Sequence, residues 1–238
     1  EVPDKGDFLD AGCGTGDYAI GLATVLGSKG TLLGVDPSEA RLNLARSKAS
    51  LRKLTNIAFQ KGSLTAIGAG ENQFDLVIGD ATLLSSDQLA PSIAEIRRAA
   101  RPGGRVALIA ATSGSFDEIH SIYWEALYQE GLLEYSSAVE RLATARPTTA
   151  DLEALGIRAG LRHVRSSTRK QRFNYADASA FLSAPLIVNY FLRGWLALLP
   201  NETDQERVLK AIAEIIERSR GGIDFDMAIR ATVLIGLK

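Results

Sequence analysis

The sequence predicts an α/β protein built on a doubly wound, mostly parallel sheet, and three observations carry this prediction. Short apolar runs alternate with helical patterns through the first half of the chain, as in sheets whose parallel strands are joined by right-handed helical crossovers. The first apolar run ends in a glycine turn at residues 12–16 that opens a helix, and the second run ends in Asp36. Such a turn and such a carboxylate are typical of a nucleoside-binding site at the carboxyl edge of the sheet.

The first half of the chain contains five expected strands and three expected helices. Ser38 and Asp87 are candidate caps for the second and third helix, because their side chains can accept a hydrogen bond from a free backbone N–H. The turn Pro102-Gly103-Gly104 leads into the fifth strand. The expected strands cover residues 7–12, 30–36, 56–60, 74–79 and 105–111, and the helices cover residues 18–26, 39–54 and 88–100.

The regular alternation stops after residue 111. Apolar residues from Phe116 to Tyr128 recur at helical spacing and predict an amphipathic helix with an aromatic stripe. A capped helix follows from Thr148 to the region of Gly160, then a strand, two helical stretches and a last strand, at residues 162–175, 177–199, 203–218 and 227–238. We expect a core at 1–112, a helical insertion at 113–147 acting as a substrate lid, and a segment at 148–238 that completes the sheet, with helices inserted around 177–218.

Two classes of nucleoside cofactor compete for the glycine turn. A dinucleotide site needs a third glycine where this chain has Asp17. A carboxylate there would repel a pyrophosphate. S-adenosylmethionine has no phosphate, and its zwitterionic methionine end and sulfonium suit the residues better. Asp10 or Asp17 could face its ammonium or sulfonium, and the glycine N–H groups could face its carboxylate.

The chain resembles the class I S-adenosylmethionine-dependent methyltransferases at four motifs in the family's order. The motifs are Leu9-Asp10-Ala11-Gly12-Cys13-Gly14-Thr15-Gly16, Gly34-Val35-Asp36-Pro37-Ser38, Phe74-Asp75-Leu76-Val77-Ile78-Gly79-Asp80 and Arg101-Pro102-Gly103-Gly104-Arg105-Val106. The resemblance covers roughly the first half of the chain. It implies a Rossmann-like seven-stranded sheet whose last strand lies antiparallel beside the fifth, and methyl transfer from S-adenosylmethionine.

The resemblance also implies a set of cofactor-binding residues. Asp36 would hold the ribose hydroxyls, and Pro37 would pack on the adenine. Where the family commonly has an acidic residue for the adenine amino group, this chain has Ser63, whose hydroxyl is a weaker acceptor. The set that the resemblance implies is Asp10, Gly12, Cys13, Gly14, Thr15, Gly16, Asp36, Pro37, Gly62, Ser63, Leu64, Gly79 and Asp80.

Composition restricts the remaining possibilities. The 27 basic and 28 acidic residues nearly balance, which disfavours nucleic acid as a partner. One cysteine and two histidines cannot form a zinc cluster, and we expect Cys13 to be packed rather than reactive. The most apolar segment, 184–199, contains Asn189 and Arg193, which favours a buried helix over a membrane span. We therefore expect a cytoplasmic protein, monomer or homodimer, with no membrane partner. Because the resembled family usually has helices before the first strand, the sequence is expected to be part of a longer chain.

Substrate choice is expected to lie in the second half of the chain. Its aromatic residues would favour an apolar or aromatic small molecule, or would simply pack the inserted helices; they are Tyr123, Trp124, Tyr128, Tyr190, Phe191 and Trp195. His120 is a candidate general base, and Asp80 a candidate for orienting substrate or cofactor. A basic run from Arg162 to Arg172 is expected to be a solvated sheet edge rather than a nucleic-acid site.

Three alternatives stay open at this level. The chain could bind S-adenosylmethionine or S-adenosylhomocysteine without catalysis. It could be an NAD-dependent oxidoreductase, against which Asp17 argues. It could also be a nucleic-acid methyltransferase, against which the charge balance and the sequence Ala81-Thr82-Leu83 after Asp80 argue.

Overall fold

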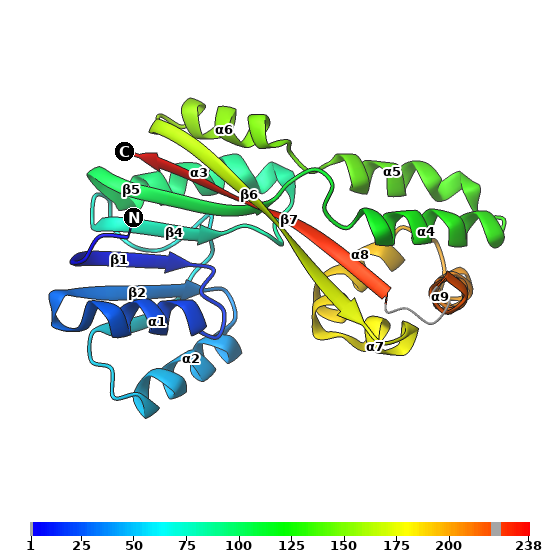
Figure 1. Cartoon of the computed structure of the whole chain (residues 1–238), viewed down its shortest axis with the longest axis horizontal. Helices are drawn as coiled ribbons and strands as arrows, with labels where there is room; N and C mark the ends of the chain where they lie inside the picture. Colours follow the sequence, from blue (N-terminus) through cyan, green and yellow to red (C-terminus); the bar gives the residue numbers. More distant parts are fainter. Residues whose placement is uncertain (1, 220–224) are drawn as a thin grey trace. The chain divides into compact units, whose positions relative to one another are not determined.

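A computed structural model describes residues 2–219 and 225–238 of the 238-residue chain. Within these residues, seven strands form one sheet in the order β3-β2-β1-β4-β5-β7-β6 (Figure 1). β1 pairs in parallel with β2 and β4, β2 with β3, and β4 with β5. The strands are β1 Gly6–Ala11, β2 Gly30–Asp36, β3 Ile57–Lys61, β4 Phe74–Asp80, β5 Ala100–Ala111, β6 Arg162–Tyr175 and β7 Phe225–Leu237. The predicted fold class is confirmed.

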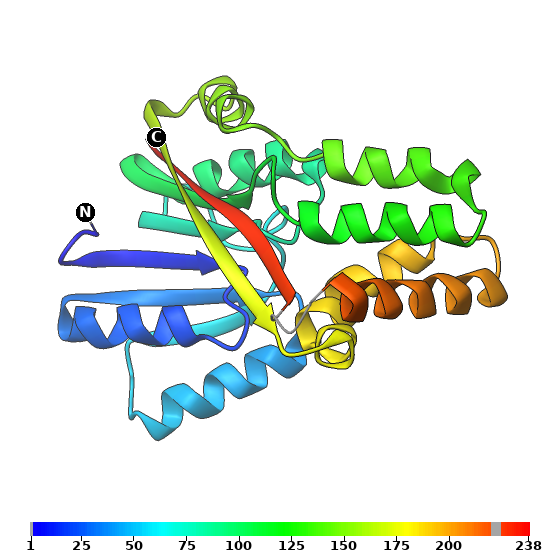
Figure 2. The same cartoon turned by 45° about the vertical axis from the view of Figure 1, so that its right-hand side comes forward.

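The last strand in the sequence, β7, lies antiparallel beside β5. At one end Gly103 N–H donates to the Lys238 carbonyl oxygen (3.0 Å), and at the other Thr112 N–H donates to that of Arg230 (3.0 Å). Residue numbers therefore rise along β5 while they fall along β7. β6 is the edge strand of this side and runs opposite to β7 (Figure 2). The predicted antiparallel insertion is confirmed.

The chain divides into two compact units. Unit 1 contains residues 1–111, 148–168 and 232–238, and unit 2 contains residues 112–147 and 169–231. The helices of unit 1 are α1 Asp17–Leu26, α2 Glu39–Leu51, α3 Leu89–Ala99 and α6 Thr149–Arg158. Those of unit 2 are α4 Asp117–Gln129, α5 Ser136–Thr144, α7 Ala178–Ser183, the π-helical η4 Ile187–Leu192, α8 Arg193–Leu196 and α9 Glu202–Ser219.

The core of unit 1 lies on both faces of the sheet, because alternate residues of a strand point to opposite faces. On β1, Phe8 packs in a cluster with residues of α1 and α2, whereas Leu9 and Ala11 pack in a cluster with residues of α3 and α6. This two-sided burial explains why β1, β2 and β4 are apolar without alternation in the sequence.

Helix capping follows the sequence prediction at two helices and departs from it at two others. The Ser38 hydroxyl accepts from the Arg41 N–H, and Thr148 and Asp151 form a reciprocal capping box. Asp87 does not cap α3, because it lies inside a short 3₁₀ turn, 86–88, that precedes the helix. The start of α9 also differs from the prediction: the helix begins at Glu202, one residue before the expected start at 203.

The actual cap of α9 is Asn201, whose side-chain oxygen accepts from the Asp204 N–H (2.9 Å). The single helix expected over 177–199 is broken into α7, η4 and α8. Ala184, before Pro185, has the extended backbone that a following proline imposes, so α7 stops there. In unit 2, α4 packs against both α5 and α9, and α7 packs against α9.

Candidate functional site

Three carboxylates meet at the carboxyl ends of adjacent strands of unit 1. Asp10 is near the end of β1, and Asp36 and Asp80 are the last residues of the flanking strands β2 and β4. Ala11 is in register with Val35 on one side and with Gly79 on the other, so Asp36 and Asp80 extend one residue beyond it. The topology therefore gathers the acidic residues of three separate sequence motifs at one edge of the sheet.

Asp10 is the electrostatic centre of this group. Its side chain is buried, with 4% of the residue exposed, and Oδ2 has no hydrogen-bond partner among the residues that the structure describes. Burial, and after it the charges of Asp80 and Asp36, raise the pKa of Asp10 to about 7. A buried carboxylate surrounded by other carboxylates is costly unless a cation neutralises it. This end of the sheet therefore suits a positively charged group.

Asp36 ties the glycine turn to the start of α2. Its Oδ2 accepts from the Gly14 N–H (3.0 Å), and its Oδ1 accepts from the Ser38 N–H (2.9 Å). Arg41 forms an ion pair with the same Oδ1 at 3.2 Å. A carboxylate has about four acceptor positions, so these three contacts leave Asp36 about one position for a hydroxyl donor. Pro37, next in the chain, is exposed beside it.

The glycines of the turn serve different purposes. Gly14 has φ +56°, and a Cβ built on it would meet no atom within 4 Å. Gly16 has φ +78°, and a Cβ there would lie 2.8 Å from the Ala45 Cβ, so this glycine lets the turn pack against α2. Gly12 has φ +84° and lies against the Asp80 backbone, with a built Cβ 3.1 Å from the Asp80 carbonyl oxygen. Only Gly14 faces open space, where a ligand can approach the backbone.

The side chains of two residues in the first motif contact other parts of the protein. Cys13 is buried in the core cluster that contains α1 and α2, and burial raises the pKa of its thiol to about 12. This agrees with a packed rather than a reactive cysteine. Thr15 donates to the exposed Asp17 carboxylate (2.8 Å), which also receives Lys48 Nζ at 2.8 Å. The expectation that Asp17 could serve the cofactor is not supported, because Lys48 already compensates its charge.

The segment expected to border the adenine begins beside Asp36. The Gly62 N–H donates to the Asp36 carbonyl oxygen (3.2 Å), and Ser63 forms a small turn with Ala66. Leu64 differs: it is buried in the sheet core, where its side chain lies against Gly79. The structure thus places Gly62 and Ser63 near the ribose-binding candidate, and gives Leu64 and Gly79 packing positions.

Asp80, the candidate for orienting substrate or cofactor, is exposed at the end of β4, and its Oδ1 accepts from the Thr82 N–H (2.9 Å). His120 belongs to unit 2 and is half-buried on α4. Its Nδ1 is buried and has no hydrogen-bond partner within the described part of the chain. Burial and the charge of Arg146 lower the pKa of His120, although Asp117 and Glu118 act in the opposite direction. The imidazole is therefore neutral at pH 7.

The aromatic residues of unit 2 divide into packed and exposed members. The Tyr123 hydroxyl donates to the Trp195 carbonyl oxygen (2.8 Å), and Trp195 stacks on Phe191 with ring centroids 5.3 Å apart. All three are buried. Trp124 and Tyr128 are exposed and stack on each other at 6.2 Å. The packing interpretation therefore holds for the first three, whereas the last two present aromatic surface.

Sequence reasoning missed Arg146. Its guanidinium carbon lies 4.5 Å from the centroid of the Phe116 ring. Arg146 is not part of any sequence motif. An arginine in a polar connecting segment is ordinarily a surface residue, so no pattern in the sequence selects it. The one usable signal was its position within the insertion that was expected to select the substrate.

A groove of about 870 Å³ lies on the sheet surface of unit 1, beside Tyr18 of α1. It is lined by apolar residues of three strands, namely Leu76 and Ile78 of β4, Val106, Ala107 and Ile109 of β5, and Val233, Ile235 and Leu237 of β7. Mostly parallel sheets are ordinarily covered on both faces. The lining of the groove also includes Arg105, His163 and Arg165.

The basic residues of β6 lie on the edge strand of the sheet, as predicted. Arg172 pairs with Asp226 at 3.2 Å, and the Arg162 guanidinium donates to the Lys238 carbonyl oxygen at 2.9 Å. Partners within the protein account for part of this charge, which favours the structural interpretation of the run. No helix in the described ranges is long and apolar enough to cross a membrane.

The sheet topology and the acidic, glycine-bounded end of β1, β2 and β4 define the class I S-adenosylmethionine-dependent methyltransferases. Comparison with known proteins gives the family directly. The chain belongs to the methyltransferase-domain family, whose model matches residues 4–138.

Individual relatives agree with this assignment. The chain is 30% identical over 116 residues to a demethylmenaquinone methyltransferase of Shouchella clausii, a match that covers 49% of each protein. It thus spans about half the length of the curated relatives it matches. In fold it is similar to the YcgJ protein of Bacillus subtilis, with TM-score 0.61 and 16% identity over 100% of this chain and 94% of that one. It is also similar in fold to phosphoethanolamine N-methyltransferase 2 of Haemonchus contortus, with TM-score 0.57 and 16% identity over 100% and 50%.

Proposed function

We propose that this chain methylates a small organic molecule with S-adenosylmethionine as the methyl donor. The observation that carries the proposal is the buried Asp10 carboxylate, whose Oδ2 has no partner among the described residues. S-adenosylmethionine has an ammonium and a sulfonium, and either positive group could serve as the partner of this carboxylate. A dinucleotide would instead bring a pyrophosphate toward Asp10, Asp36 and Asp80, where like charges repel.

The roles of the surrounding residues follow from their positions. Asp36 would accept a ribose hydroxyl at its remaining acceptor position, and the exposed Pro37 would pack on the adenine. Gly14 would let the methionine end approach the backbone, since a Cβ there would point into open space. Gly62 and Ser63 would border the adenine from the β3 side.

The chemistry that the cofactor supplies is an activated methyl group. The protein must align the acceptor with the sulfonium and exclude water from it, and a base is needed only when the acceptor arrives protonated. His120 stays the candidate base, because a neutral imidazole can accept a proton. Asp80 stays a candidate for orienting the substrate or the cofactor.

The helical insertion at 113–147, which lies in unit 2, is proposed to act as the substrate lid, and the helices inserted around 177–218 belong to the same unit. Its exposed aromatic residues Trp124 and Tyr128 support an acceptor with an apolar or aromatic part. Relatives are named demethylmenaquinone methyltransferases, so demethylmenaquinone is the first acceptor to test. A cytoplasmic location and a monomeric or homodimeric state are part of the same proposal.

The decisive experiment is calorimetric titration with S-adenosylhomocysteine, with NAD as the competing ligand. We expect binding by the wild type, a loss of at least tenfold in affinity for Asp36→Ala, and no change for the control Asp17→Ala, whose carboxylate pairs with Lys48. Preferential binding of NAD would overturn the proposal. Formation of S-adenosylhomocysteine from S-adenosylmethionine with a panel of acceptors then separates an enzyme from a binding domain without catalysis.

A further inference from the structure

Unit 2 contains a guanidinium whose charge has no anionic partner among the residues that the structure describes. Arg146 lies in the segment between α5 and α6, and its side chain is half-buried. Apart from the Phe116 ring, on which it lies at 4.5 Å, the described residues give its guanidinium no hydrogen bond and no carboxylate. Burial lowers the pKa of Arg146. Arginines that lose water in this way ordinarily gain an ion pair, because a desolvated charge is otherwise costly.

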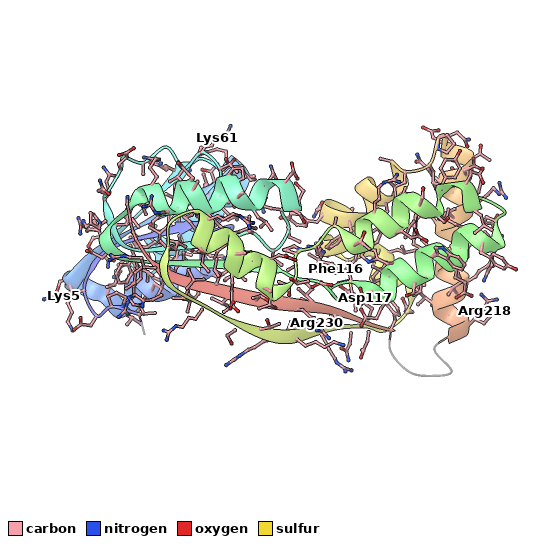
Figure 3. All side chains as sticks on the ribbon, turned by 90° about the horizontal axis from the view of Figure 1, so that it is seen from above. Lys5, Lys61, Phe116, Asp117, Arg218 and Arg230 are labelled. Carbon is pink, nitrogen blue, oxygen red and sulfur yellow. The ribbon has the colours of Figure 1, made fainter. Side chains whose placement is uncertain are left out.

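The aromatic ring that carries this guanidinium is held rigidly. Phe116 is fully buried and packs on Phe191, with ring centroids 4.5 Å apart. Its N–H donates to the Ala228 carbonyl oxygen at 2.8 Å. Figure 3 places Phe116 and Asp117 at the start of α4. The guanidinium therefore rests on a fixed platform rather than on a mobile side chain.

The backbone of Phe116 adds a second sign of function. Its φ of +66° and ψ of 18° lie in the left-handed region, which bulky residues seldom adopt. Such strain costs on the order of 1–3 kcal/mol and tends to occur at ligand-binding sites. The residue with this backbone is the one whose ring contacts Arg146.

His120 supplies a second unsatisfied group one turn further along α4. Its N–H donates to the Phe116 carbonyl oxygen (3.1 Å), so the two residues are on the same side of the helix. Its buried Nδ1 has no partner in the described ranges, 2–219 and 225–238. Arg146 is close enough for its charge to act on the imidazole. A buried ring nitrogen without a partner costs about 1–3 kcal/mol unless a ligand satisfies it.

We propose that Arg146 and His120 form a subsite for an anionic oxygen group of the methyl acceptor, a carboxylate or a phosphate. The planar guanidinium offers two parallel N–H donors, which match the two oxygens of such a group. The neutral imidazole, with its proton on Nδ1, donates a third hydrogen bond. In this tautomer Nε2 carries the lone pair, so anion binding and the candidate base role use different ring nitrogens. The inference rests on the proposed function and narrows the acceptor to acidic molecules.

The test measures binding of three probes to the whole chain by saturation-transfer NMR, with and without S-adenosylhomocysteine. The probes are benzoate, its neutral analogue benzamide, and inorganic phosphate. We expect benzoate or phosphate to bind at least tenfold more tightly than benzamide, and the preferred anion identifies a carboxylate or a phosphate subsite. The ¹⁵N shift of His120 Nδ1 should move as the anion binds.

Variants separate the subsite from a general effect of positive charge. Arg146→Met keeps an apolar stem over the Phe116 ring and should weaken anion binding at least tenfold. Arg146→Lys keeps the positive charge but loses the paired N–H donors of the guanidinium, and its anion binding should be weakened less. Arg141→Met, which removes an exposed arginine of α5, should bind as the wild type does.

Each variant must show the wild-type circular dichroism spectrum and bind S-adenosylhomocysteine. Equal binding of benzoate and benzamide, binding of neither anion, or wild-type anion binding by Arg146→Met would each overturn the subsite. Failure of S-adenosylhomocysteine to bind the wild type would instead count against the proposed function. The two proposals can therefore fail separately.

Discussion

The two units of this chain contain uncompensated charges of opposite sign. In unit 1, Asp10 is buried near the charges of Asp36 and Asp80, and its Oδ2 has no hydrogen-bond partner within the described ranges. In unit 2, Arg146 lies on the Phe116 ring and lacks an anion among the described residues. Folding alone seldom leaves such groups unpaired, because each costs free energy. This difference in sign underlies the two proposals, a cationic ligand for unit 1 and an anionic group for unit 2.

The charge on Asp10 should give the largest stability effect. Because the pKa of Asp10 is raised from 3.8 to about 7 in the folded protein, the folded state binds more protons than the unfolded state between these values. Wild-type stability therefore falls as the pH rises from about 4 to about 7. Asp10→Asn removes this loss and should raise the free energy of unfolding above pH 7, by on the order of 4 kcal/mol at most.

Denaturant titrations at pH 4.5 and pH 8 measure this difference. The gain should be small at the lower pH and large at the higher one. Asp17→Asn is the matched control, since its exposed carboxylate has a lowered pKa through hydrogen bonds with Lys48 and Thr15. A gain in stability of equal size at both pH values would show that the pKa of Asp10 is not raised in the folded protein.

The two units also begin a helix in the same unusual way, which allows a second comparison. Gly16 before α1 and Phe116 before α4 both have left-handed backbone, with φ of +78° and +66°. Phe116 tolerates this because its ring is fully buried, whereas a Cβ on Gly16 would lie 2.8 Å from the Ala45 Cβ. Gly16→Ala should cost about 2–4 kcal/mol.

Thermal unfolding followed by calorimetry tests this expectation. Gly14→Ala is the control, because its φ is also positive but its Cβ would meet nothing within 4 Å. Gly14→Ala should lose less stability than Gly16→Ala. It should instead weaken the binding of S-adenosylhomocysteine. If both variants lost the same stability, close packing against α2 would not be the reason for Gly16.

Cofactor affinity should depend on pH through the same carboxylate. With a pKa of about 7 for Asp10, the ionised fraction rises roughly tenfold between pH 6 and pH 8. Binding of S-adenosylmethionine should strengthen by about that factor, since the ionised form attracts its positive groups. Calorimetry on Asp10→Asn, which carries no charge at either pH, should show weaker binding and a flatter profile. A wild-type profile as flat as that of the variant would remove Asp10 from the site.

The sequence predicted unit 1 far better than unit 2, and the reason is physical. In unit 1 strand periodicity, glycine turns and acidic strand ends all specify the same structure, and β2 was predicted with the correct bounds. The distance along the chain between Asp10, Asp36 and Asp80 does not matter, because parallel strands bring their carboxyl ends to one edge.

In unit 2 local signals do not decide the outcome. The helix over 177–199 breaks at Pro185, and α9 takes Asn201 rather than Thr203 as its cap. Arg146 escaped notice because its meaning comes from the Phe116 ring, thirty residues away in the sequence. A cation–π contact of this kind leaves no spacing pattern for a sequence to display.

The smallest predicted effect is the loss of stability when a helix-capping side chain is removed, compared with removal of a nearby side chain that caps no helix. Thr148→Ala in unit 1 and Asn201→Ala in unit 2 should each cost about 1 kcal/mol, because each removes an acceptor for a free N–H at a helix start. Asp87→Ala and Thr203→Ala should change stability by less than about 0.5 kcal/mol. Scanning calorimetry of the four variants measures these shifts, and two resolved transitions would assign Thr148 and Asn201 to different ones. A cost for Thr203→Ala as large as that for Asn201→Ala would show that Asn201 is not the main cap of α9.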